Sequence, residues 1–190
     1  DDALVEALLA SSPPSTLAGG SRLLDRRPPL VITGHHDAEI RAHVARTGLK
    51  VESSFHRGWA QGRTSGVALA AELRPGSDLL ICPVDVPLVG PALLRSLAEE
   101  WQRIGAPSRG WLAPFLPPRG DRIPRYGHPL VMGATLAERA AALVPDAPLR
   151  DLRHAAEPLA SLETSDQAIL DDLDTPGDLE ALRRRLESQL

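Results

Sequence analysis

The residues of this sequence with the clearest chemical potential are aspartates that follow apolar segments. Asp85 closes the run Leu79-Leu-Ile-Cys-Pro-Val-Asp85, and Pro83 and Pro87 stiffen the chain on either side of it. A run without polar alternation is typical of a strand buried on both faces of an α/β sheet, and such sheets bind ligands beyond the carboxyl ends of their strands. Asp85 is therefore a candidate metal ligand, although a turn aspartate also commonly accepts bonds from nearby backbone amides.

A second acidic turn lies far downstream, where Asp171-Asp-Leu-Asp174 leads into Thr-Pro-Gly-Asp178. Asp174 is the second candidate metal ligand, but Asp171, Asp172 and Asp178 compete with it, and helix capping explains one or two of these carboxylates. Magnesium takes only one or two protein carboxylates when a substrate supplies phosphates. If Asp85 and Asp174 meet at one edge of the sheet, they would hold Mg²⁺ for metal-dependent phosphate chemistry.

Two further segments have residue types suited to binding. Gly62, Thr64 and Ser65 open a predicted helix with small residues and free amides, which favours an anion or a ribose hydroxyl. A plain N-cap by Thr64 or Ser65 explains the same residues equally well. His128, between Gly127 and Pro129, precedes a predicted strand and would face the same edge of the sheet, or it is a surface histidine.

Other segments offer weaker chemistry. The glycines of the segment 16–23 could cradle a phosphate, but serines and prolines precede it where a buried strand is required, so a surface loop is the alternative. The remaining histidines do not have the spacing of a zinc site, and the single cysteine, Cys82, lies in the apolar run and is expected to be buried and reduced.

Composition limits the class of protein. The chain has 190 residues, enough for one domain over residues 1–190. The net charge of −4 gives no basic surface for nucleic acid, and Lys50 is the only lysine. No apolar stretch is long enough for a membrane span and the first residues lack the basic region of a signal peptide, so we expect a cytoplasmic protein.

The elements that must position these residues follow a strand–helix alternation. Strands are predicted at 30–33, at 49–53 and up to Asp85, each followed by a helix: from Asp37 to Gly48, from about Gly66 to Leu73, and from Ala92 to Ile104 after Pro91. Three βα units in succession favour an α/β domain with a parallel sheet.

The second half is less regular. We expect strands at 110–114 and 130–132, a proline-rich excursion at 114–121, and one or two strands within 161–172. Helices are predicted after the capping box Thr135–Glu138, at 148–154, and after Thr175, with another at 3–10 near the start.

Five segments taken in order resemble the MobA-like nucleotidyltransferases, and the molybdenum cofactor cytidylyltransferases most closely. The segments are Val31-Ile-Thr-Gly-His-His36, Trp59-Ala-Gln-Gly62, Cys82-Pro-Val-Asp-Val-Pro87, Gly127-His-Pro129 and Asp172-Leu-Asp-Thr-Pro-Gly-Asp-Leu179. The resemblance implies a Rossmann-like three-layer domain of the nucleotide-diphospho-sugar transferase type with a mostly parallel sheet.

The same resemblance implies an enzyme that transfers a nucleoside monophosphate, CMP in the favoured case, from an NTP to a phosphorylated acceptor such as molybdopterin or its molybdenum form. Asp85 and Asp174 would be catalytic and hold Mg²⁺, the loop with Gly62, Thr64 and Ser65 would border the nucleotide, and His128 would face the acceptor. A molybdoenzyme is the implied protein partner.

One family feature is not found in the expected place. The family begins with a strand, a glycine-rich loop and a lysine that grip the triphosphate, whereas this chain opens at what resembles the following helix, and Leu17-Ala-Gly-Gly-Ser-Arg22 only echoes the loop. The missing loop leaves one alternative open, a non-catalytic module that binds a nucleotide or a pterin. A sugar-phosphate nucleotidyltransferase, which would use a similar cleft, is a second alternative.

Overall fold

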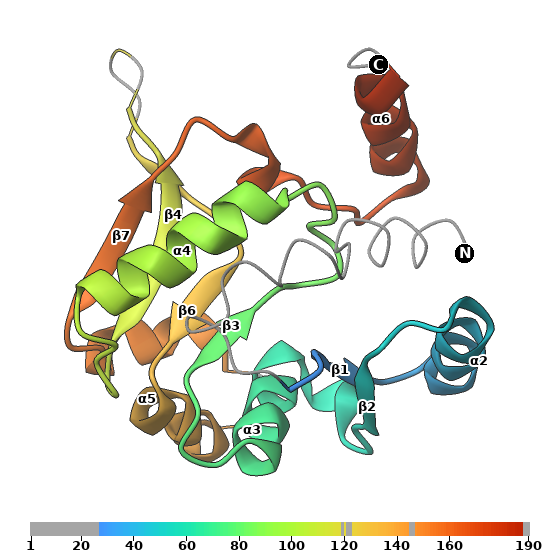
Figure 1. Ribbon diagram of the computed structural model, residues 1–190, viewed down its shortest axis with the longest axis horizontal. Helices are drawn as coiled ribbons and strands as arrows, with labels where there is room; N and C mark the ends of the chain where they lie inside the picture. Colours follow the sequence, from blue (N-terminus) through green and yellow to red (C-terminus); the bar gives the residue numbers. More distant parts are fainter. Residues whose placement is uncertain (1–26, 119, 121–122, 145–146, 188–190) are drawn as a thin grey trace.

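The computed structural model describes residues 27–118, 120, 123–144 and 147–187 as a mixed α/β fold (Figure 1). The predicted helix at 3–10 and the glycine-rich segment 16–23 lie outside these residues. Among the described residues no helix is long and apolar enough to cross a membrane.

The first two strands form a small parallel sheet. Strand β1 (Leu30–Thr33) leads into helix α2 (Asp37–Thr47), and β2 (Glu52–Phe55) pairs with β1 from Leu30 opposite Glu52 to Thr33 opposite Phe55. The predicted strand 30–33 is confirmed. The second strand starts three residues later than the predicted 49–53, because Gly48 ends α2 with a φ of +68° and Val51 N–H then turns back to the Leu49 carbonyl.

Helix α3 (Arg63–Leu73) follows a short 3₁₀ turn, η2 (Trp59–Gln61), and begins three residues before the predicted Gly66. Gly62 makes the earlier start possible, because its φ of +93° suits glycine alone among common residues. Gly66 lies inside the helix, where a Cβ would touch the Ile32 side chain at 3.8 Å. The glycine thus marks the contact between α3 and β1.

Strand β3 (Leu79–Ile81) is shorter than predicted. It ends at Ile81, since Pro83 has no N–H group to continue a ladder, and Asp85 lies in the turn four residues beyond. The prediction that the strand reaches Asp85 is therefore wrong, and Cys82, expected to be buried, is exposed.

The third unit closes with helix α4 (Pro91–Arg103), which starts with proline at its first position as predicted. Its buried stripe consists of Leu93, Leu97, Ala98 and Trp101. All three predicted βα units are thus present.

The larger sheet has the order β3-β6-β4-β5, with β7 also pairing with β4. Its remaining strands are β4 (Trp111–Leu116), β5 (Arg125–Tyr126), β6 (Leu130–Met132) and β7 (Leu159–Glu163). Strand β6 is antiparallel to both β3 and β4, and β7 is parallel to β4, so β3, β4 and β7 run in one direction.

The sheet is therefore mixed rather than mostly parallel. The chain leaves β4 and returns through β5 and β6 without a helical crossover, and such a short return produces antiparallel neighbours. The predicted proline-rich excursion is partly this hairpin, and Pro114 is one of the buried residues of β4.

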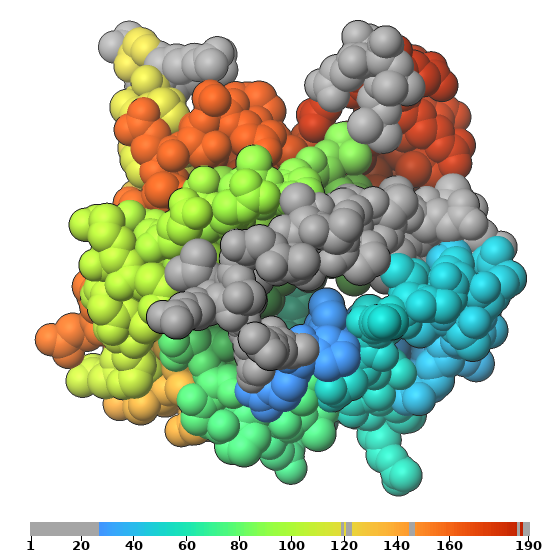
Figure 2. Space-filling model, in the orientation of Figure 1, coloured from blue at the N-terminus to red at the C-terminus, as the bar shows by residue number. Residues whose placement is uncertain are grey.

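Side chains that alternate along β4 face two cores. Trp111 and Ala113 pack with α3, α5 (Ala134–Glu138), η3 (Arg139–Ala142) and η4 (Leu149–Ala155), whereas Leu112 and Leu116 pack with α4. The result is three layers, with α4 lying across one face of the sheet in Figure 1 and forming the yellow-green surface in Figure 2.

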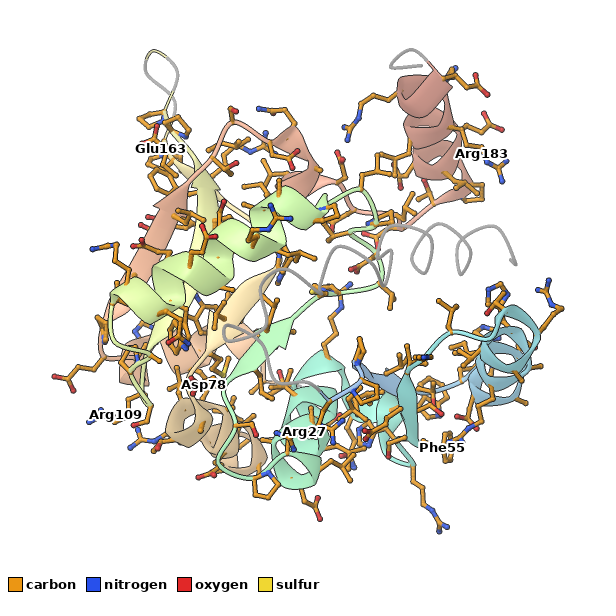
Figure 3. All side chains as sticks on the ribbon, viewed as in Figure 1. Arg27, Phe55, Asp78, Arg109, Glu163 and Arg183 are labelled. Atoms are coloured by element: carbon orange, nitrogen blue, oxygen red, sulfur yellow. The ribbon has the colours of Figure 1, made fainter. Side chains whose placement is uncertain are left out.

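Asp78 holds the layers together at the start of β3. Its carboxylate accepts from Trp101 Nε1 at 2.8 Å and from Ala134 N at 3.0 Å, and Figure 3 shows it between α4 and α5. The predicted capping box of Thr135 and Glu138 does not form, because α5 begins after Gly133 with no side-chain cap from its own segment. The cap comes instead from a residue distant in sequence.

The last elements carry the acidic turn. After β7 come η5 (Gln167–Leu170) and α6 (Pro176–Glu187), which projects to one side in Figure 1. Thr175 and Asp178 cap α6 reciprocally, with Thr175 N–H donating to Asp178 Oδ2 at 2.8 Å and Asp178 N–H to Thr175 Oγ1 at 3.3 Å. The predicted cap by Thr175 is confirmed.

Candidate functional site

Strand register brings two of the predicted site segments together. Ile81, the last residue of β3, pairs with Leu130, the first residue of β6. Because the two strands are antiparallel, the turn that contains Asp85 and the segment Gly127–Pro129 leave the sheet at the same edge. The sequence places these segments more than forty positions apart, and only the sheet makes them neighbours.

A third segment lies against both. Leu173 N–H donates to the Asp85 carbonyl oxygen at 2.9 Å, and His128 N–H donates to the Ile169 carbonyl oxygen at 2.9 Å. A Cβ on Gly127 would lie 2.1 Å from that same Ile169 oxygen, so the close approach requires glycine. Backbone contacts therefore assemble residues 85, 127–128 and 169–173 into one polar edge, which we call the rim.

The two carboxylate oxygens of Asp85 differ in their contacts among the described residues. Its Oδ2 lies 2.6 Å from a guanidinium nitrogen of Arg63, the first residue of α3. Its Oδ1 is buried and has no hydrogen-bond partner among the described residues. Since a buried carboxylate oxygen without a partner is costly, this atom is suited to a cation or to a donor from a ligand.

His128 lies beside this carboxylate and is largely neutral at pH 7. Burial lowers the pKa of its imidazole below the ordinary value of 6.5, and the Arg63 charge adds to that, while the negative charges of Asp85 and Asp172 act in the opposite direction. Its Nδ1 is buried without a hydrogen-bond partner among the described residues. A neutral imidazole here can hydrogen-bond a ligand without adding positive charge.

The four aspartates of the acidic turn divide into two pairs. Asp171 is held by both terminal nitrogens of Arg185, one of them at 2.9 Å, and Asp178 belongs to the α6 cap, so these two have structural roles. Asp172 and Asp174 flank Leu173, whose amide contacts the Asp85 backbone, and both are exposed.

The acidic turn thus reaches the rim through the backbone amide of Leu173. Asp172 acts on the pKa of His128 through its charge, and Asp174 is two residues further along the chain. A metal role for Asp174 stays a prediction.

The predicted nucleotide loop begins α3. Gly62 precedes the helix, and Ser65 Oγ donates to the Gly62 carbonyl at 2.6 Å and lies 2.7 Å from His56 Nε2. The Thr64 hydroxyl is buried and donates to the Ala147 carbonyl at 2.6 Å. Neither side chain caps the helix, and Arg63 in the same loop reaches the Asp85 carboxylate. An ion pair between Arg63 of the loop and Asp85 of the rim therefore connects the two.

A sequence model of the MobA-like NTP transferase domain matches residues 21–162, more than half of the chain. The chain belongs to this family. It is accordingly a nucleotidyltransferase-type enzyme, and the resemblance drawn from the five sequence segments is confirmed. No curated protein sequence matches the chain.

Solved structures of nucleotidyltransferases share the fold. A nucleotidyl transferase from Methanothermobacter thermautotroptrophicus has a TM-score of 0.69 at 20% identity over 98% of this chain and 82% of its own. CMP:2-keto-3-deoxy-manno-octonic acid synthetase, solved with CTP, has a TM-score of 0.71 at 11% identity over 98% and 88%. Rv0371c from Mycobacterium tuberculosis, solved with manganese, has a TM-score of 0.62 at 21% identity over 94% and 85%. At these identities the likeness establishes the fold class.

The residues of the rim fit a hard divalent cation of the kind that this nucleotidyltransferase family implies. The described residues contain no cluster of three or more histidine, cysteine, aspartate or glutamate side chains that could enclose a metal by themselves. The Asp85 Oδ1, which has no hydrogen-bond partner among the described residues, is nevertheless an oxygen atom suited to a cation. This arrangement suits a cation that takes one or two carboxylates from the protein and its other ligands from phosphates and water.

Sequence reasoning did not single out Arg63 or Asp172 of this nucleotidyltransferase. Arg63 could have been found as the one basic residue in the Gly62–Gly66 loop, but its contact with Asp85 depends on how α3 meets the turn after β3. A cavity of about 70 Å³ elsewhere in the molecule includes Trp111, Tyr126 and Arg153 but no residue of the rim. The contacts, rather than this cavity, define the candidate site.

Proposed function

We propose that this nucleotidyltransferase transfers CMP from CTP to a phosphorylated acceptor such as molybdopterin or its molybdenum form, with Mg²⁺ as the cation. In this reaction a phosphate oxygen of the acceptor forms a bond to the α-phosphorus of CTP, and the bond from that phosphorus to the bridging oxygen breaks, so that pyrophosphate leaves. The protein does little covalent chemistry in such a transfer, and its task is to position the reactants and balance their charge.

The rim residues are assigned roles that match their surroundings. Asp85 would hold the cation through its unpartnered oxygen, with Asp174 or its neighbour Asp172 as the second carboxylate. Bound Mg²⁺ would supply positive charge to the phosphates. His128, neutral near pH 7, would donate or accept a hydrogen bond from the acceptor.

Gly62, Thr64 and Ser65 would border the nucleotide at the start of α3. Since the hydroxyls of Thr64 and Ser65 already donate within the protein, we expect the backbone amides of this loop rather than those hydroxyls to face the phosphates.

The observation that carries the proposal is the buried Asp85 Oδ1 beside a histidine Nδ1, since neither atom has a hydrogen-bond partner in the described part of the chain. Two buried polar atoms without partners at one point of a nucleotidyltransferase favour a bound ligand there. A divalent cation is supported by the structural neighbour solved with manganese, and CTP by the neighbour solved with that nucleotide. A molybdoenzyme partner and a cytoplasmic location stay predictions.

The test is pyrophosphate release from the purified protein with CTP or GTP, Mg²⁺, and molybdopterin as acceptor. We expect turnover with CTP, and a loss of about 100-fold in Asp85→Ala, since one well-placed electrostatic group is worth this much. Asp151→Asn, which changes an exposed carboxylate on η4, is the matched control and should keep full activity. Equal rates in wild type and Asp85→Ala would remove Asp85 from the site.

A sugar-phosphate acceptor is the second candidate. It is supported by fold neighbours whose names are 4-diphosphocytidyl-2C-methyl-D-erythritol synthase and CMP:2-keto-3-deoxy-manno-octonic acid synthetase. Replacing molybdopterin by sugar phosphates in the same assay, with mass analysis of the product, separates the two candidates. Turnover with a sugar phosphate alone would favour the second.

A further inference from the structure

We infer that Arg63 is a nucleotide-positioning residue that neutralises Asp85 in the free protein and turns to the phosphates of the nucleotide when a cation reaches Asp85. This inference rests on the proposed function, because it assigns Asp85 to a cation. It gives a role to a residue to which neither the family match nor the sequence analysis assigned one. It also implies two positions of the Arg63 side chain, one without and one with a cation at Asp85.

The two partners of the ion pair have very different freedom to move. The side chain of Arg63 is 73% exposed, whereas that of Asp85 is 15% exposed. A mostly exposed arginine loses little when it leaves a carboxylate, because water replaces the contact and the long side chain regains its rotamers. The buried carboxylate has no such alternative. Arg63 is therefore the mobile partner and Asp85 the fixed one.

Charge determines the direction of the movement. The described residues offer Asp85 no positive partner other than Arg63, and the second carboxylate oxygen stays unpaired. A divalent cation at this carboxylate would face a guanidinium that contacts the same group at 2.6 Å, and the two positive charges repel each other. A nucleotide that arrives with the cation brings phosphate oxygens, which an arginine binds better than an already neutralised carboxylate.

The position of Arg63 allows this exchange without a backbone change. It is the first residue of α3 and follows Gly62, so its side chain starts at the loop assigned to the nucleotide and ends at the carboxylate assigned to the cation. Because the side chain is mostly exposed, its rotation would be enough to take the guanidinium from one to the other.

The experiment is calorimetric titration of wild type and Arg63→Gln with Mn²⁺ alone, and separately with CTP in the presence of saturating Mn²⁺. We expect Arg63→Gln to bind Mn²⁺ about two- to fivefold more tightly, because a competing exposed ion pair is lost. It should bind CTP about tenfold more weakly, because a charge-assisted phosphate contact is lost. Arg63→Lys should recover part of the CTP affinity. Arg57→Gln, which changes an exposed arginine in the preceding turn, is the matched control and should leave both affinities unchanged.

The outcomes separate this inference from the proposed function. Unchanged or weaker Mn²⁺ binding in Arg63→Gln would overturn the exchange, even if the wild type releases pyrophosphate. The opposite shifts of the two affinities would support it, even if no acceptor gives turnover. A wild type that binds neither Mn²⁺ nor CTP would overturn both.

Discussion

The centre of the larger sheet and the rim at its edge are built on opposite principles. Strands β4 and β6 are buried along nearly their whole length, and Leu112 and Met132 are fully enclosed by apolar neighbours. At the rim, backbone hydrogen bonds hold the segments together, while buried side-chain atoms of Asp85 and His128 lack hydrogen-bond partners within the residues that the structure describes. The difference shows that the core supplies the stability and that the rim leaves its polar side chains available for a ligand.

A mutation in the centre should have the largest effect on stability. We expect Leu112→Ala to lower the free energy of unfolding by about 2–5 kcal/mol, because it removes a fully buried side chain and leaves a cavity. Chemical denaturation followed by circular dichroism measures this. Leu159→Ala on the neighbouring strand β7 is the matched control, since Leu159 is 51% exposed. Equal losses in the two variants would contradict the contrast between core and surface.

A mutation at the joint between the two regions should affect both stability and activity. Gly127→Ala places a Cβ where the Ile169 carbonyl oxygen lies at 2.1 Å, so the backbones must separate. We expect a loss of about 1–3 kcal/mol in unfolding free energy, as for overpacking, together with a loss of pyrophosphate release. At Gly90 an added Cβ meets no atom of the described residues within 4 Å, so Gly90→Ala should preserve activity. Full activity in Gly127→Ala would mean that the rim does not need the close approach.

A polar contact between the layers should contribute less to the free energy of unfolding than a core side chain does. Its removal should leave the rim intact. Asp78→Ala removes the acceptor of Trp101 Nε1, a donor in a buried side chain, and of Ala134 N. We expect a loss of about 1–3 kcal/mol in unfolding free energy with little change in the affinity for CTP. Thermal unfolding and CTP titration of the same preparation measure the two effects. A large loss of CTP affinity with an unchanged free energy of unfolding would contradict this prediction.

The smallest effect should appear as a pH dependence of stability. Because burial lowers the pKa of His128 below 6.5, the unfolded chain binds its proton more readily than the folded protein does. The part of the stability that depends on neutral His128 is therefore fully present above about pH 6.5, and it is lost as the pH falls from there through the lowered pKa of the folded state. Denaturation midpoints measured across this range should vary less in His128→Gln than in the wild type. His154→Gln, an exposed histidine on η4, should behave as the wild type does.

Local sequence signals determined much of the architecture. Pro91 at the start of α4, Gly48 at the end of α2, and Thr175 with Asp178 before α6 act within a few residues of themselves, so their effects could be predicted from neighbouring letters. The five segments in register were also sufficient to identify the MobA-like family. The candidate residue Asp85 could be named because it closes an apolar run between Pro83 and Pro87, and His128 because it lies between Gly127 and Pro129 before a predicted strand.

Tertiary structure alone decided how these residues meet. The antiparallel insertion of β6 between β3 and β4, the cap that Asp78 gives to α5, and the ion pair of Arg63 with Asp85 join residues far apart in the chain. Such contacts depend on the sum of packing over the whole sheet, and no local pattern of residue types encodes them. For the same reason, Asp171 looks like Asp172 and Asp174 in sequence, and only its pairing with Arg185, fourteen residues further along the chain, gives it a structural role.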